Sequence, residues 1–206
     1  MRRHELSLLF VVMLSLFLGV APATAQEVRV SLRPGQVFME LVGQVLNPTA
    51  TTSLQFGYLT YLRGVDGIFT TPTPSEQTAI FTFFNDTTTR SIVNVGPMRT
   101  IVRDGTMTIY AKTTPSDFAN PDSFRSGMVV QVSRLRHTVI VNTTTNAFVT
   151  VFENEITDVA PFLLRDVLIR IGQPQETFRL TVSGQIPSPA PPSGWISGFA
   201  EGTRER

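Results

Sequence analysis

The chain has 206 residues, of which 17 are basic and 16 acidic, for a net formal charge of +1, and it contains no cysteine. This length suits a single domain with a sizeable core, which burial rather than disulfide bonds must stabilise. Nearly balanced charge without a basic stripe argues against nucleic-acid binding.

The first 25 residues have the three parts of a secretory signal peptide. Arg2 and Arg3 precede an apolar run, and the small residues Ala23 and Ala25 stand just before Gln26. The run is slightly shorter than the roughly 20 residues that span a bilayer, which favours cleavage after Ala25 over a retained anchor. We therefore expect a secreted or periplasmic protein with no membrane span after cleavage. Sixteen arginines against one lysine suggest a GC-rich bacterial genome.

Beyond the signal, short runs of alternating apolar and polar residues are separated by turn-forming residues, a pattern typical of antiparallel strands. Strands are expected near 28–32, 36–46, 53–63, 77–84, 90–95, 98–103, 106–112, 127–141, 147–157, 166–171 and 177–186. The sequence thus predicts one all-β domain over 26–186, either an antiparallel β-barrel or a two-sheet β-sandwich of about 8–11 strands. Residues 187–206 are rich in proline, glycine and serine and are expected to form a tail.

The first hairpin that the sequence specifies in detail contains Asp104 and Gly105. This pair has the composition of a type I′ turn, in which both central residues need positive φ. The turn would pair Arg103 with Thr106 and the flanking residues in register.

The second hairpin has a loop at 143–146. This register places Arg136 opposite Glu153, and Arg134 opposite Glu155, on one face of the sheet. Cross-strand pairs of opposite charge stabilise a sheet, whereas a shift of one residue would lose both pairs. On the other face, His137 would lie opposite a phenylalanine, Phe152.

The ends of the predicted domain carry similar short segments, Val-Gly-Gln-Val at 42–45 and Ser-Gly-Gln-Ile at 183–186. Pairing of the first long strand with the last would close the sheet and remove its edges. This layout is similar in outline to secreted small-ligand barrels and to the dirigent and allene-oxide-cyclase type of barrel. The similarity concerns architecture and transfers no functional residue.

Few residues in the sequence suggest catalysis. His137 is the only histidine after the signal, so a histidine-based metal cluster is excluded within one chain, and there is no Gly-x-Ser-x-Gly motif. Glu153, Glu155 and Asp158 form the densest acidic cluster, which could serve acid-base chemistry or calcium binding. The facing arginines are a sufficient structural explanation for these acids. No cofactor or metal is expected.

The strand around Tyr58 and Tyr61 is apolar on both faces. Such a strand is usually central, covered by the core on one side and by another sheet, a ligand or a partner on the other. Tyr58 and Tyr61 are therefore candidate ligand-binding residues. Arg134 and Arg136, on the strand expected at 127–141, are two further candidates.

Three functions remain open from the sequence. The first is a non-catalytic module that binds a small hydrophobic ligand or a protein partner, or that has a structural role. The second is an enzyme of the barrel-isomerase, cyclase or carbohydrate-active type, in which Glu153, Glu155 and His137 would line one concavity. The third is a cell-surface assembly or adhesion module whose exposed strand edges pair between chains.

Overall fold

The structure, a computed structural model, describes residues 26–187 and 193–203, so the predicted signal at 1–25 lies outside the described residues. The described chain is nearly all β-structured. Its elements are β1 (Gln26–Val30), β2 (Val37–Leu46), β3 (Thr52–Leu62), β4 (Phe81–Val95), β5 (Met98–Ala111), the 3-10 helix η1 (Pro121–Arg125), β6 (Met128–Asn142), β7 (Ala147–Val159), β8 (Phe162–Leu164), β9 (Val167–Ile171), β10 (Thr177–Gln185) and β11 (Gly194–Gly202).

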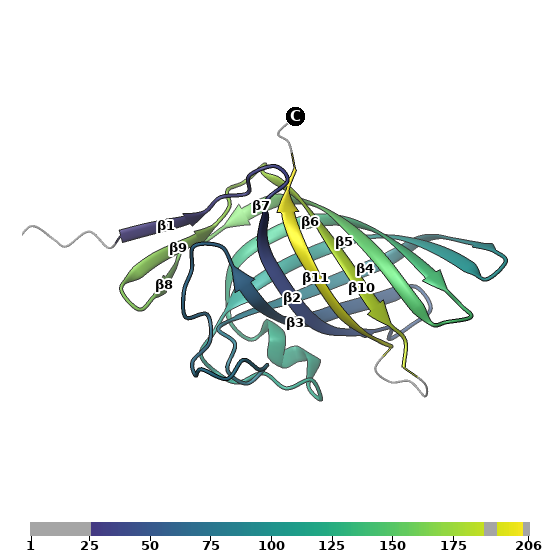
Figure 1. Cartoon of the computed structure of the whole chain (residues 1–206), viewed down its shortest axis with the longest axis horizontal. Coiled ribbons are helices and arrows are strands. Elements are labelled where there is room, and N and C mark those ends of the chain that lie inside the picture. Colours follow the sequence, from purple (N-terminus) through teal and green to yellow (C-terminus); the bar gives the residue numbers. More distant parts are fainter. Residues whose placement is uncertain (1–25, 188–192, 204–206) are drawn as a thin grey trace, which may run out of the picture.

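Eight of these strands close into an antiparallel barrel in the order β2-β3-β4-β5-β6-β7-β10-β11, with β11 returning to β2 (Figure 1). Neighbouring strands of the barrel are consecutive in the chain except where β8 and β9 are inserted between β7 and β10. Of the two predicted all-β architectures, the barrel is therefore the one that forms.

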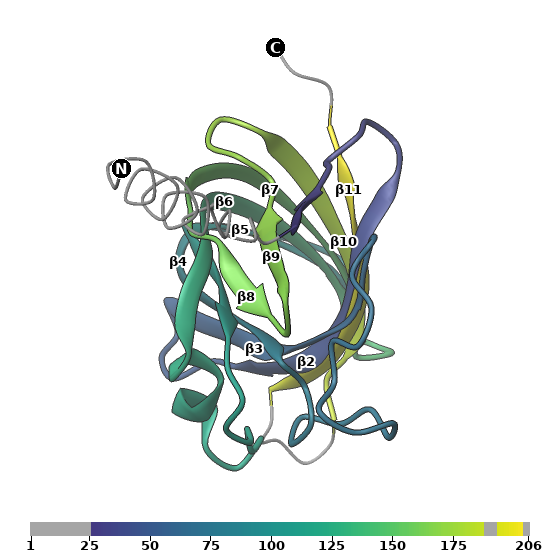
Figure 2. The same cartoon turned by 90° about the vertical axis from the view of Figure 1, so that its left-hand side faces the viewer.

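A small second sheet, in the order β1-β9-β8, lies across one end of the barrel (Figure 2). Ile169 and Ile171 of β9 are buried and belong to the same apolar cluster as the barrel interior. The ring of Phe162 in β8 meets that of Phe81 edge-on, with centroids 5.8 Å apart. The inserted strands therefore seal this end of the lumen.

Side chains alternate between the lumen and the outer face along most of each barrel strand, as the period-two pattern predicts, and β-bulges such as the one between Glu40 and Leu41 interrupt the alternation. Near the sealed end the lumen is filled by aromatic rings, among them Phe38 and Phe178, whose centroids lie 5.4 Å apart in an edge-to-face arrangement. Both are fully buried, and burial of each such ring contributes about 1.5–3 kcal/mol to the free energy of unfolding. Gly43 and Gly57 face each other across β2 and β3, and the ring of Phe83 lies over them where side chains would collide.

The outer face of β3 is covered by the segment that joins β5 to β6. Phe56 of β3 packs against Phe124 of η1 and Phe118, with ring centroids 5.4 and 6.2 Å away. The second face of this strand was expected to be covered by another sheet, a ligand or a partner. Instead a connecting segment of the same chain covers it at Phe56 and Tyr58, while Tyr61 is 40 % exposed.

Lys112, the one lysine in the sequence, holds this covering segment in place. Its buried ammonium group donates to the hydroxyls of Ser116 and Ser126 at 3.0 and 3.1 Å and to the carbonyl oxygens of Pro115 and Ser123. The charge is thus satisfied by oxygen dipoles, which a buried cation requires.

The predicted turn at Asp104-Gly105 is wrong, because both residues lie within the continuous strand β5. The chain reverses at Gly96, which supplies the positive φ of 55°, and Val95 pairs with Met98 across that turn. At Gly105 the missing side chain serves close approach, since a Cβ would collide with the backbone carbonyl of Asp86. The Asp-Gly pair therefore marks a tightly coiled strand.

The prediction of a tail over 187–206 is also wrong for residues 194–202, which form β11. Sheet closure was expected between the first long strand and the strand at 177–186. Instead β11 is inserted between β2 and β10 and completes the barrel. Small residues such as Gly198 and Ala200 weaken the strand signal of this segment, but they face the lumen where space is short.

The second hairpin has the predicted register. Arg136 lies opposite Glu153 and Arg134 opposite Glu155, while His137 faces Phe152. The latter two rings meet edge-on, with centroids 4.7 Å apart.

Two aspartate substitutions on β11 test whether this strand closes the barrel. Ala200 is fully buried and faces the lumen, whereas Ser197 is exposed on the outer face. We expect Ala200→Asp to lower the free energy of unfolding by about 3 kcal/mol or more, because it buries an unpaired carboxylate. Ser197→Asp should change it by less than about 0.5 kcal/mol. Urea denaturation measures both values, and equal effects would mean that β11 is a tail.

Candidate functional site

The end of the lumen opposite the small sheet holds a cavity of about 90 Å³. Its wall is mostly apolar and is formed by side chains from β2, β3, β5, β6, β7 and β11, including Val45, Ile101, Val139, Val141, Phe148 and Ile196. Asn47 and Ser193 lie among the lining residues on the loops at this end. The cavity therefore lies at the mouth of the barrel, opposite the sealed end.

Several polar side chains interrupt this apolar wall. Gln55 and Thr150 are 3 % exposed and Ser53 is completely buried. Each points inward because it stands in register with inward residues of the neighbouring strands. The Nε2 of Gln55 donates to the Oγ of Ser53 at 2.7 Å, but its Oε1 has no partner among the described residues.

The chemically distinctive pair in the cavity is Arg103 and His137, which stand opposite each other on β5 and β6. A terminal nitrogen of Arg103 lies 3.2 Å from Nε2 of His137, and Nε of Arg103 donates to the Oγ1 of Thr89 at 3.2 Å. Because a guanidinium only donates, Nε2 of His137 must accept. The imidazole is therefore neutral with its proton on Nδ1, and this nitrogen has no partner among the described residues.

The surroundings of His137 keep it neutral well below neutral pH. Burial disfavours the imidazolium, and the positive charge of Arg103 repels it. Together they lower the pKa of His137 to about 3, against a smaller opposing effect of Asp104. Burial also lowers the pKa of Arg103 below its ordinary value. No carboxylate forms an ion pair with Arg103 in the part of the chain that the structure describes.

Further unpartnered polar atoms lie deeper in the lumen. They belong to residues that face inward from β4, β6 and β7, and among the described residues they are both amide atoms of Asn85, Oε1 of Gln131, Oγ of Ser133 and Oδ1 of Asn154. Such groups cost roughly 1–3 kcal/mol each when nothing bonds to them. The lumen thus offers hydrogen-bonding positions for water or for a ligand.

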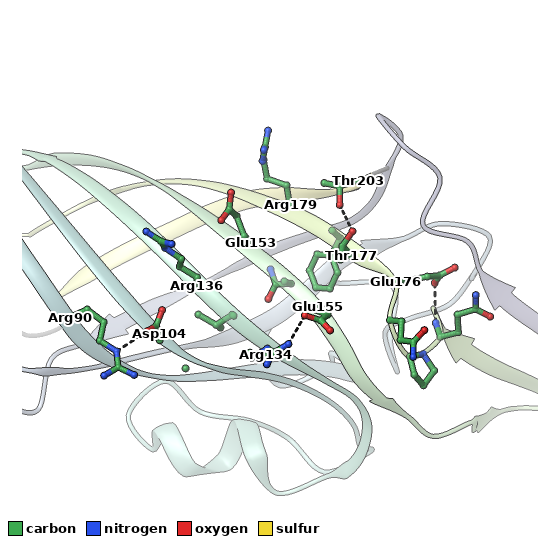
Figure 3. A pocket seen from close by; sticks show the side chains of 17 residues that line it. Arg90, Asp104, Arg134, Arg136, Glu153, Glu155, Glu176, Thr177, Arg179 and Thr203 are labelled. Atoms are coloured by element: carbon green, nitrogen blue, oxygen red, sulfur yellow. Dashed lines mark hydrogen bonds and ion pairs between the residues drawn. The ribbon is translucent and has the colours of Figure 1, made fainter. Parts of the chain in front are cut away.

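A larger hollow, a groove of about 1150 Å³, lies on the outer face of the barrel (Figure 3). On this face a row of charges alternates in sign on consecutive strands, and we call it the charge ladder: Asp104, Arg136, Glu153, Arg179 and Glu201, of which all but Glu201 line the groove. Arg134 and Glu155 form an ion pair beside it at 2.6 Å. Along this groove each charge lies opposite a charge of the other sign, so the charges already neutralise one another. The smaller cavity is lined by polar atoms without partners among the described residues, and we therefore take it as the better candidate site.

The enzyme hypothesis required three residues in one concavity, and the structure separates them. Glu153 and Glu155 lie in the outer groove, whereas His137 is inside the barrel and 1 % exposed. Arg136 lies opposite Glu153 on the outer face, and its neighbour His137 faces the other side of the sheet because successive side chains of a strand alternate. His137 therefore cannot share a site with the two glutamates.

The other candidate residues also lie outside the lumen. Arg134 and Arg136 line the outer groove. Tyr58 packs against Phe69 and Phe118, and burial, helped by the charge of Glu76, raises the pKa of its phenol. Tyr61 is 40 % exposed.

Arg103 is the residue that sequence reasoning missed. The predicted turn at Asp104-Gly105 made Arg103 a turn-flanking residue and concealed its place on a long strand. Arg103 stands at an even spacing from Ile101 and Met107 along the strand, and both of these residues face the lumen. This alternation was the signal that could have placed Arg103 inside the barrel.

Comparisons with protein-family models, with curated proteins and with solved structures found no match for this chain. Within residues 26–187 and 193–203, no helix has the length and apolar character needed to cross a membrane. The same residues contain no group of three or more side chains placed to hold a metal ion.

The protonation of His137 can be tested directly, because it is the only histidine after residue 25. Because the pKa of its imidazole is depressed, between about pH 6.5 and pH 3 the imidazole binds a proton in the unfolded chain but not in the folded chain. We expect the free energy of unfolding to decrease as the pH falls through that window, by about 1.4 kcal/mol per pH unit from this one group. His137→Gln should remove this part of the slope.

NMR titration of the imidazole, with urea denaturation at several pH values, measures both quantities. A pKa near 6.5, or equal slopes in the two proteins, would contradict the placement of His137 in the lumen.

Proposed function

We propose that this protein is a binding protein that takes a small, largely apolar molecule into the cavity at the open mouth of its barrel. The observation that carries the proposal is the asymmetry of the lumen. One end is filled with aromatic side chains and sealed by the small sheet, while the other holds a cavity with an apolar wall and unpartnered polar groups. Apolar pockets with a few polar groups at barrel mouths are typical ligand sites.

The size of the cavity limits what enters it. At about 90 Å³ it is smaller than the roughly 150 Å³ cavity that admits benzene in an engineered protein. Only one end of a ligand therefore fits inside, and the rest must lie along the apolar wall towards the mouth.

The charges on the outer face favour a barrel that is surrounded by water rather than by lipid. The charge ladder covers strands β5, β6, β7, β10 and β11, whereas a lipid-facing barrel carries an apolar outer band. With the signal expected at 1–25, this favours action in the periplasm or outside the cell.

A plugging substitution tests the proposed cavity. Val139 is 8 % exposed and lines the cavity, while its neighbour Ile140 is 46 % exposed on the outer face. We expect Val139→Phe to weaken binding of 1-octanol at least about tenfold, a loss of about 1.4 kcal/mol, because the added ring fills the space. Ile140→Phe should leave binding unchanged.

Isothermal titration calorimetry gives the affinities, and circular dichroism verifies the fold of each variant. If the wild type binds neither 1-octanol nor xenon, and Val139→Phe is simply more stable, the barrel is a scaffold with a filled interior.

One further feature favours assembly between chains as a second candidate function. Closure pairs the barrel strands on both sides, but β4 pairs with β3 only up to Thr88, and Thr89 still donates to Thr51 just before β3, so the end of β4 at 90–95 pairs with β5 alone. Ile92, Val93 and Val95 on this free edge are 48 %, 57 % and 72 % exposed. An apolar strand edge of this kind is a template for pairing with the same edge of a second copy.

Light scattering after size-exclusion chromatography tests this second function. A dimer that Val93→Lys dissociates, while 1-octanol binding persists, would establish assembly through this edge. A monomer at all accessible concentrations would remove it.

A further inference from the structure

Arg103 places a positive charge at an apolar cavity without supplying a counter-ion. The nearest carboxylate in sequence, Asp104, faces the outer side of the sheet and pairs with Arg90 at 2.7 Å. The described residues give acceptors only to Nε and to one terminal nitrogen of the guanidinium, and both acceptors are neutral. A half-buried guanidinium that no carboxylate neutralises has donors left over, and it favours the binding of an anion.

A second, independent observation points to a ligand at the same place. His137 is 1 % exposed and lines the cavity, and its Nδ1, which carries the proton, has no acceptor among the described residues. The cavity is therefore lined by a cation that no carboxylate neutralises and by a buried histidine whose N–H has no acceptor among the described residues.

The shape of the cavity selects among anions. A guanidinium presents a planar fork of donors, which matches the two oxygens of a carboxylate. A tetrahedral phosphate or sulfate would leave further charged oxygens against the apolar wall formed by Val139, Val141 and Phe148. A space of about 90 Å³ holds a carboxylate with a few carbon atoms.

We propose that the ligand is a monocarboxylate with an apolar body, bound with its carboxylate inside the barrel against Arg103. His137 is a positioning residue, because its Nε2 accepts from the guanidinium and orients it. The apolar body lies along the cavity wall and extends to the mouth. This inference rests on the proposed function and names the chemical class of its ligand.

The test compares two probes with the same apolar chain, octanoate and 1-octanol, titrated into the purified protein by calorimetry. We expect octanoate to bind about 10- to 100-fold more tightly than 1-octanol, the range that corresponds to a charge-assisted hydrogen bond. Arg103→Met should lose this advantage and retain the affinity for 1-octanol. Arg136→Met, which removes an exposed arginine from the next strand, is the matched control for net charge and should behave like the wild type.

The melting temperature of Arg103→Met distinguishes whether Arg103 binds the ligand or only stabilises the fold. Because Arg103→Met removes an unpaired cation, its melting temperature without ligand should be equal to or above that of the wild type. A folded variant with a markedly lower melting temperature and unchanged octanoate affinity would overturn the proposal. The comparison of the two probes on the wild type needs no variant and decides the question if Arg103→Met does not fold.

The remaining outcomes are distinguishable. Equal affinity of the wild type for octanoate and 1-octanol would overturn the carboxylate anchor and leave the binding function intact. Binding of neither probe would overturn both.

Discussion

The pairing of β11 with β2 is the constraint on which the rest of the structure depends. Without it, eight strands would form an open sheet with two free edges and no interior. With it, one face of every strand becomes the lumen, where Gly43 leaves room for the ring of Phe83 and Gly198 lets β11 approach Val182 of β10. Closure thus decides which residues are inside and whether a cavity exists at all.

The lumen divides into a part that stabilises the fold and a part that is available for function. Near the small sheet, buried rings such as Phe38, Phe81 and Phe178 supply apolar contact, and the inserted strands keep water out. Near the mouth, His137 is buried with an unpartnered Nδ1, and Arg103 is half-buried without a neighbouring carboxylate, so both groups are expected to cost stability. Proteins commonly retain such costly groups where binding or catalysis needs them.

Alternation and charge pairing predicted much of the fold from the sequence. The register of β6 and β7 followed because a shift would have separated Arg136 from Glu153. The errors arose at small residues, whose turn propensity and use at crowded strand positions look alike in a sequence. Gly105 was taken for a turn and the segment around Gly198 for a tail, although both glycines serve close contacts between strands.

The candidate site could be predicted only in part. His137 was correctly placed opposite Phe152, but grouping it with Glu153 ignored that the two face opposite sides of the sheet. Arg103 could not be recognised, because its significance depends on a missing counter-ion. That absence becomes visible only when the neighbours of a side chain are known in three dimensions.

The most direct test of this account is a crystal structure of the protein grown with octanoate. The account predicts a closed barrel with the carboxylate within hydrogen-bonding distance of the guanidinium of Arg103 and the hydrocarbon chain leading to the mouth. Octanoate bound only at the charge ladder, or a lumen that is empty of ligand at saturating octanoate, would contradict it.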